Sequence, residues 1–214
     1  MENLVKEKKK RGFVMELNKL LKMAIEFHGH KCPAMPLGLR AGLAAMKKLG
    51  VERASNKELF CFFEGGPAHA QMCFGDGVQV ATGCTFGKEN IEKLNYSKLA
   101  ITLIDVKTKK AVRVAVRPDF QKKGLGSKFV QMRKEGIEPK DIPSDIVEPA
   151  IENIMNQPDE VLFKISEVFN YDFKGKKSTF EWYECEKCGE IVFSHGIKVK
   201  DEKKLCITCY KGKE

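Results

Sequence analysis

Four cysteines near the C-terminus form two Cys-x-x-Cys pairs, and this spacing predicts a tetrahedral metal site. The pairs are Cys185/Cys188 and Cys206/Cys209, with 17 residues between them. Structural zinc takes four protein ligands, and two such pairs supply four thiolates. Because the protein fills every position, we expect a structural zinc rather than a catalytic one. A redox dithiol pair or an iron site is the alternative.

A second group with ligand chemistry lies near the N-terminus, between two predicted helices. His28, His30 and Cys32 occur within five residues, and an irregular junction can bring their side chains together. Pro33 keeps Cys32 just before a helix N-terminus, a position that lowers the pKa of a thiol. These residues could hold a metal ion, or supply a thiolate beside a histidine base. A helix-capping histidine and a buried cysteine are the structural alternative.

A third cluster belongs to a predicted helix after a buried strand. Cys73, Asp76 and Gln79 are three residues apart, so they share one helix face, and a capping aspartate with a core cysteine is the structural alternative. We predict that this face meets the histidine junction in a pocket for a metal or a small anionic ligand. The candidate catalytic residues are Cys32, His30 and Asp76, the candidate ligand-binding residues are Glu64, Gln79, Thr85 and Lys88, and the candidate ligands of a second metal are His28, His30, Cys32, Cys73 and Cys84.

The elements that must position these residues follow from hydrophobic periodicity. Apolar residues at helical spacing predict helices, and alternating valines on both sides of a lysine-rich turn predict a hairpin. Helices and antiparallel strands in separate blocks predict an α+β fold, with helices packed on an antiparallel sheet. The expected elements are helices at 14–28 and 36–50, a strand at 59–63, a helix at 69–82, strands at 99–106 and 111–117, helices at 120–134 and 145–156, and a strand at 161–171.

Composition limits the classes of protein to consider. The 214 residues are 43% hydrophobic and 31% charged, which excludes disorder, collagen-like repeats and coiled coil as descriptions of the whole chain. No apolar run approaches the roughly 18 residues of a membrane span, and the basic start lacks a secretory signal's apolar segment. We therefore expect a cytoplasmic protein with no membrane partner. The expected domains are a basic flexible tail at 1–12, an α+β core at 13–173 and a four-cysteine zinc-finger domain at 174–214.

The net charge of +9 is concentrated at the two ends of the chain, which suits contact with an anionic surface. This gives a rival function, a binding or regulatory module whose finger contacts protein or nucleic acid while the core only dimerises. The sequence shows no aromatic strip for stacking bases, so a protein contact is expected before nucleic acid. The finger lysines concerned are Lys198, Lys200, Lys203 and Lys204.

Two glycine-containing segments resemble phosphate-binding loops. Residues 83–88 are one residue short of a nucleotide-binding P-loop, and Glu89 stands where a Ser or Thr would hold magnesium. Residues 116–126 resemble the acetyl-coenzyme A loop of N-acetyltransferases, in which a helix start cradles phosphate. That fold needs a core strand after the helix, and residues 137–143 are polar and broken by prolines. An acetyl-CoA-dependent N-acetyltransferase is therefore only a minor alternative.

Together the motifs resemble the FmdE family, which takes its name from formylmethanofuran dehydrogenase. The resemblance rests on Phe27–Pro33 with Gly38, on Cys73-x-x-Asp76-x-x-Gln79 and on Thr82–Lys88, and Gly77 stands where the family pattern has alanine. It implies an α+β core that forms an intertwined homodimer, and the cysteine tail matches members with an added treble-clef-like zinc finger.

The resemblance also implies a role in one-carbon metabolism of the methanogenesis type. The implied partner is a molybdenum or tungsten formylmethanofuran dehydrogenase, whose redox chemistry belongs to a pterin-bearing subunit. We therefore expect an accessory subunit, or a ligand- or metal-binding protein, rather than the redox catalyst. The expected cofactors are a structural zinc in the finger and a second metal ion in the core.

Overall fold

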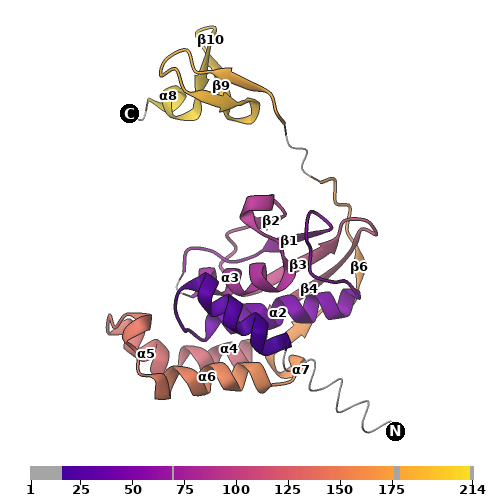
Figure 1. Cartoon of the computed structure of the whole chain (residues 1–214), viewed down its shortest axis with the longest axis vertical. Helices are drawn as coiled ribbons and strands as arrows, with labels where there is room; N and C mark the ends of the chain where they lie inside the picture. The colour runs from indigo at the N-terminus through magenta and orange to yellow at the C-terminus, as the bar shows by residue number, and fades with distance from the viewer. Residues whose placement is uncertain (1–15, 69, 176–178, 213–214) are drawn as a thin grey trace. The chain divides into compact units, whose positions relative to one another are not determined.

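The computed structural model describes residues 16–68, 70–175 and 179–212, which belong to two compact units (Figure 1). The division falls between Phe173 and Lys174. The basic tail expected at 1–12 lies outside the described residues. Within the described ranges, every helix is too short or too polar to cross a membrane.

A six-stranded sheet forms the frame of the first unit. Its order is β2-β1-β3-β4-β5, and β6 also pairs with β4. Neighbouring strands are antiparallel except β1 and β2, a parallel pair at one edge that the sequence did not indicate. The predicted hairpin is confirmed as β3 and β4. The strands are β1 (Leu59–Phe63), β2 (Ile91–Lys93), β3 (Ala100–Asp105), β4 (Lys110–Val116), β5 (Phe163–Ile165) and β6 (Phe169–Asn170).

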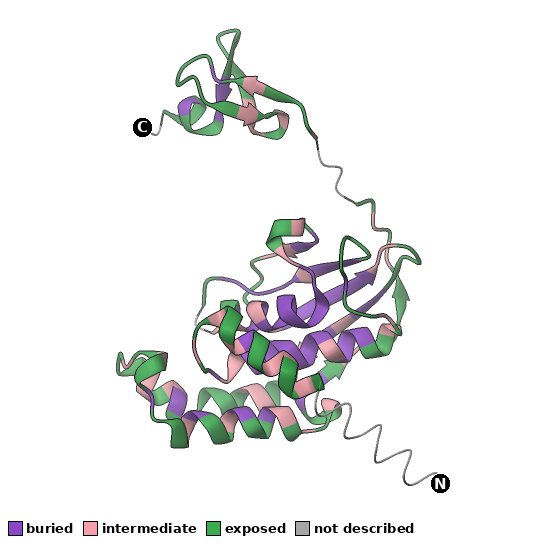
Figure 2. Cartoon of the chain, viewed as in Figure 1, coloured by how far each residue is buried: buried purple, intermediate pink, exposed green. Residues whose placement is uncertain are grey.

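Helix α2 (Ala34–Leu49) lies against this sheet, and α3 (Gln71–Thr82) packs along α2 (Figure 1). Their apolar side chains join those of β1, β3 and β4 in one buried cluster. Figure 2 shows the buried residues gathered on these helices and on the central strands. The helix before α2 is described from residue 16 to residue 28, and its apolar face packs into a second cluster. The histidine junction therefore connects two anchored helices.

Two glycines bring the backbones of α2 and α3 into direct contact. A Cβ atom at Gly38 would overlap the carbonyl oxygen of Phe74, and one at Gly77 would overlap the carbonyl oxygen of Met35. A glycine inside a helix costs about 1 kcal/mol relative to alanine, so such a position needs a reason. Close approach is the reason here, and it fixes the N-terminal halves of the two helices against each other.

The chain between β4 and β5 is entirely helical. Gly126 ends one helix and Ser127 caps the next through its side chain, so the single helix predicted at 120–134 is in fact two. No strand occurs between α4 and α7, all of which is described, so the N-acetyltransferase alternative lacks the core strand that it needs. The helices are α4 (Pro118–Leu125), α5 (Lys128–Lys134), α6 (Ser144–Asn156) and α7 (Asp159–Leu162), with 3-10 turns at Phe86–Lys88 (η1) and Pro139–Asp141 (η2).

The strand predicted at 161–171 is wrong in its extent. Residues 159–162 form α7, and only two short pieces beyond them, β5 and β6, pair with β4. Pro158 directly precedes α7 and starts it with acidic residues in its first turn. A proline at this position favours a helix start, which divided an otherwise apolar run.

The second unit consists of two hairpins and a short helix. The first cysteine pair follows β7, and the second pair lies at the start of α8. Its buried core contains Cys185, Cys206 and Cys209 together with Leu205. This arrangement fits a small zinc finger, as predicted. The elements are β7 (Trp182–Glu184), β8 (Ile191–Phe193), the 3-10 turn η3 (Ser194–Gly196), β9 (Ile197–Lys200), β10 (Lys203–Cys206) and α8 (Ile207–Lys211).

Candidate metal centre

The junction before α2 turns His28 and Cys32 toward each other. Gly29, with a φ of 87°, ends the preceding helix, and Pro33 caps the start of α2. Cys32 Sγ lies 3.5 Å from His28 Nε2. Tetrahedral zinc, with bonds of about 2.3 Å to sulfur and about 2.0 Å to nitrogen, would separate two such ligand atoms by about 3.5 Å.

Helix α3 supplies a third ligand and a support for the first. Cys73 lies in its first turn, and one ligand atom from each of His28, His30, Cys32 and Cys73 lies within 4.8 Å of the others. One turn further along, Asp76 Oδ2 lies 2.8 Å from His28 Nδ1. A carboxylate on one imidazole nitrogen leaves the other directed at the ligand group, as in many metal sites.

His30 contains a buried atom that lacks a partner. Its Nε2 makes no hydrogen bond to any described residue, although its ring centroid lies 4.2 Å from that of His28. Leaving a buried polar atom unsatisfied costs about 1–3 kcal/mol, so such atoms are rare. A metal ion bound by the four ligand atoms would satisfy it. Two imidazoles and two thiolates are a donor set that suits zinc.

Burial and hydrogen bonding set the protonation of the group. Hydrogen bonds to Asp76 and Cys73 raise the pKa of His28 to about 9. Burial and the charge of His28 lower the pKa of His30, which favours the neutral imidazole that a metal requires. The hydrogen bond between the two thiols raises the pKa of Cys32 and lowers that of Cys73.

The thiolate is therefore on Cys73, which corrects the prediction that the pKa of Cys32 is lowered. Cys32 does face the start of α2, and the N–H groups of Ala34 and Met35 do favour its charged form. Its burial and the shared proton outweigh them, because Cys73 is less buried and stands beside His28.

Cys84 lies outside this group, so its predicted place among the metal ligands is corrected. It follows α3, and eleven residues of helix separate two positions by about 16 Å. Its backbone N–H donates to Thr82 Oγ1 at 3.1 Å, and burial raises its thiol pKa to about 11. Cys84 is a buried core cysteine.

The predicted ligand-binding residues make contacts of different kinds. Gln79 Nε2 donates to Asp76 Oδ1 at 3.3 Å, which supports the carboxylate that holds His28. Glu64 is buried and pairs with Arg113 through both oxygens, at 2.6 and 2.8 Å. Lys88 Nζ donates to two backbone carbonyls at 3.3 Å, and the Thr85 N–H donates to a side-chain amide. Only Gln79 is linked to the ligand group by these contacts.

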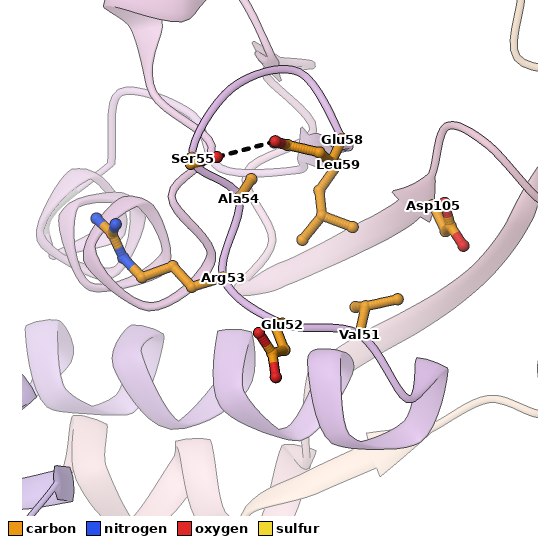
Figure 3. Close-up of a pocket in the computed structure, with 8 residues that line it drawn as sticks. All are labelled: Val51, Glu52, Arg53, Ala54, Ser55, Glu58, Leu59 and Asp105. Atoms are coloured by element: carbon orange, nitrogen blue, oxygen red, sulfur yellow. Dashed lines mark hydrogen bonds between the residues drawn. The ribbon is translucent and has the colours of Figure 1, made fainter.

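Two surface cavities lie near opposite ends of α2, a helix of about 24 Å. The larger, about 370 Å³, follows the C-terminal end of α2 and is lined by Glu52, Arg53, Glu58 and Asp105 among others (Figure 3). The smaller, about 330 Å³, is lined in part by His30. The smaller cavity therefore adjoins the ligand group, and the larger one does not.

The four C-terminal cysteines form the second ligand group. Their sulfur atoms also lie within 4.8 Å of one another, and those of Cys188 and Cys206 are 4.0 Å apart. The N–H of Cys206 donates to Cys185 Sγ, and the N–H of Cys209 donates to Cys206 Sγ, both at 3.3 Å. The N–H groups of Cys188 and Cys206 lower the pKa of Cys185 to about 6, because they stabilise its thiolate.

The finger also exposes aromatic side chains, which the sequence reading missed. Trp182 lies opposite Phe193 in the β7–β8 hairpin, and each is 58% exposed. Phe180, just before β7, is 90% exposed. The signal was present, since two aromatic residues flank the first cysteine pair at hairpin spacing. The expectation that the finger lacks an aromatic strip is therefore wrong.

Comparisons with known proteins add two kinds of similarity. A family model described as FmdE, molybdenum formylmethanofuran dehydrogenase operon, matches residues 27–164, a range that contains His28, His30, Cys32, Cys73 and Asp76. A crystal structure of an FmdE-like protein of tungsten formylmethanofuran dehydrogenase, from Syntrophus aciditrophicus, superposes with a TM-score of 0.59. It is 22% identical, and the match covers 92% of this chain and 93% of that one, which shows a shared fold.

A curated relative comes from Archaeoglobus fulgidus. That protein, named a probable S-adenosyl-L-methionine-binding protein, is 34% identical over 206 residues. The match covers 91% of this chain and 53% of that protein. The chain therefore spans about half the length of this relative.

Proposed function

The chain belongs to the FmdE family, and from this premise we propose that its core binds a metal ion through His28, His30, Cys32 and Cys73. The observation that carries the proposal is the convergence of four ligand atoms, one of which, His30 Nε2, is buried without a partner. Zinc is the proposed ion, because it accepts two nitrogens and two sulfurs in a tetrahedron. Asp76 is a positioning residue that holds His28.

Four protein ligands leave a tetrahedral zinc without an open position, which favours a binding or structural role over turnover. Under this proposal Cys32 and His30 act as ligands, in place of the nucleophile and base suggested by sequence. The protein would then be an accessory metal-binding protein of one-carbon metabolism. A molybdenum or tungsten formylmethanofuran dehydrogenase is its proposed partner, a link supported by the family description, and a homodimer is its proposed state.

The second proposed ion is a structural zinc in the finger, held by Cys185, Cys188, Cys206 and Cys209. The four sulfur atoms lie together, and three of these cysteines form most of the buried core of the unit. An apolar core this small rarely supports a fold without a metal.

Elemental analysis of the full chain tests both sites. We expect two zinc ions per chain in the unaltered protein, and one in each of the variants Cys73→Ser and Cys188→Ser. The matched control is Cys84→Ser, a buried cysteine outside both groups, which should keep two. A single zinc that Cys73→Ser leaves in place would refute the core site.

A second candidate function is a binding module that works through the finger. The exposed pair Trp182 and Phe193 favours it, together with the lysines of β9 and β10. Aromatic side chains beside positive charge suit stacking of single-stranded nucleic acid. Binding of an RNA oligonucleotide that weakens steeply with salt and is lost in Trp182→Ala would support this candidate. Unchanged binding in that variant would refute it.

The name of the Archaeoglobus relative suggests S-adenosyl-L-methionine as another ligand. About half of that protein has no counterpart in this chain, and the ligand can belong to either half. Calorimetry with S-adenosyl-L-methionine and the full chain decides between the two. Saturable binding would assign the ligand to the matched half, and no heat of binding would assign it to the other.

A further inference from the structure

We infer that the groove beside His30 binds a small ligand with an anionic group, a carboxylate or a phosphate, next to the proposed core metal. The groove has a volume of about 330 Å³ and lies between the histidine junction and residues 139–147. The inference rests on the proposed function, because His30 is both a proposed metal ligand and part of the groove wall.

The charge of the groove comes from two lysines that differ in their pairing. Lys31 Nζ lies 2.6 Å from Glu148 Oε1, so its charge is balanced and its position is fixed at the rim. Lys140 is exposed, lines the groove and forms no ion pair with a carboxylate among the described residues. Lys140 therefore leaves one uncompensated positive charge on this surface.

Helix α6 adds uncharged donors. Its first residue, Ser144, lines the groove, and Val147 in the same turn does so too. The first N–H groups of an α-helix have no intrahelical acceptor, and the partial positive charge of the helix dipole is concentrated there. The Ser144 hydroxyl supplies a further donor. Asp141 and Asp145 belong to the same stretch of chain, but neither lines the groove.

The remaining walls are apolar. Pro139, Ile142 and Val147 line the groove, and the last two are buried. Apolar walls with a few convergent polar groups are typical of small-molecule sites, and a volume of this size lies at the small end of their range. The geometry thus suits a short organic acid or phosphate ester, with its anionic end at Lys140 and Ser144.

Amide chemical shifts of the zinc-loaded full chain provide the test. The probes are sodium acetate, inorganic phosphate and acetamide, which has the shape of acetate without its charge, all at constant ionic strength. We expect saturable shifts at the amides of Lys140 and Ser144 with the anions and none with acetamide. A tighter response to acetate identifies a carboxylate site, and a tighter response to phosphate a phosphate site. An equal response to acetamide would overturn the inference.

Matched lysine variants sharpen the result. Lys140→Gln should weaken anion binding about fivefold, whereas Lys122→Gln, an exposed lysine of α4 outside the groove, should leave it unchanged. Equal binding by both variants would overturn the inference. Zinc content of the same samples separates the two failures. One zinc per chain refutes the proposed core metal, and two zincs without an anion response refute the groove alone.

Discussion

The two ligand groups of this chain differ in what holds their side chains in place. In the core, the ligands lie near the ends of helices that large apolar clusters already pack, and Asp76 fixes one imidazole. In the finger, Cys185, Cys206 and Cys209 are themselves most of the buried core. The comparison teaches that four ligands can be added to a stable fold or can be the main support of a small one.

The most severe test of this comparison removes one finger ligand. Cys206→Ser should abolish the fold of residues 179–212, because the thiolates and their metal replace an apolar core there. The amide spectrum should lose all dispersed finger signals and keep those of the core. The matched variant Cys73→Ser should lose the core zinc with both units still folded. A folded finger in the Cys206→Ser variant would break the comparison.

A change to the helix contact tests what positions the core ligands. Gly77→Ala should destabilise the core by about 3 kcal/mol or more, because the new Cβ would overlap the backbone of α2 and backbone cannot move aside cheaply. The melting temperature of the core measures the effect. Gly124→Ala, where a Cβ meets nothing within 4 Å, is the control and should change stability by less than about 1 kcal/mol. Similar values for both variants would contradict the argument.

The pH dependence of zinc affinity sharpens the electrostatic side of the comparison. At neutral pH the metal-free core keeps protons on His28, with a pKa of about 9, and on Cys32, whose pKa is raised. Zinc must displace both, so its affinity should fall with falling pH by up to about a hundredfold per unit. Chelator competition with the Cys188→Ser variant, which retains only the core site, measures this. An affinity independent of pH would show that neither proton is held.

The smallest expected effect concerns the support of His28. Asp76→Asn removes the charge that Nδ1 faces but keeps the shape of the side chain, so zinc affinity at the core site should fall about tenfold. Chelator competition provides the value, and the finger site should not change. The control is Asp119→Asn, an exposed carboxylate on α4. An unchanged core affinity would mean that Asp76 only fills space.

Much of the fold followed from local pattern. The β3–β4 hairpin and helices α2 and α3 were predicted because alternation and helical periodicity report which face of an element is buried. The parallel pairing of β2 was missed, since three residues carry too little pattern to indicate a partner. The run at 161–171 misled for a related reason, because an apolar stretch does not show where β5 and β6 leave the sheet.

The sequence alone determined the finger group and the types of ligand in the core. Each finger pair is local, so spacing of three residues is enough to place two sulfurs together. Only the tertiary structure decided that Cys73 joins His28 and Cys32 while Cys84 does not. Both cysteines flank one helix, and the backbone contact at Gly38 and Gly77 sets which end of α3 meets the junction. The protons were likewise decided by packing, because burial and the thiol–thiol contact, more than the helix start, raised the pKa of Cys32.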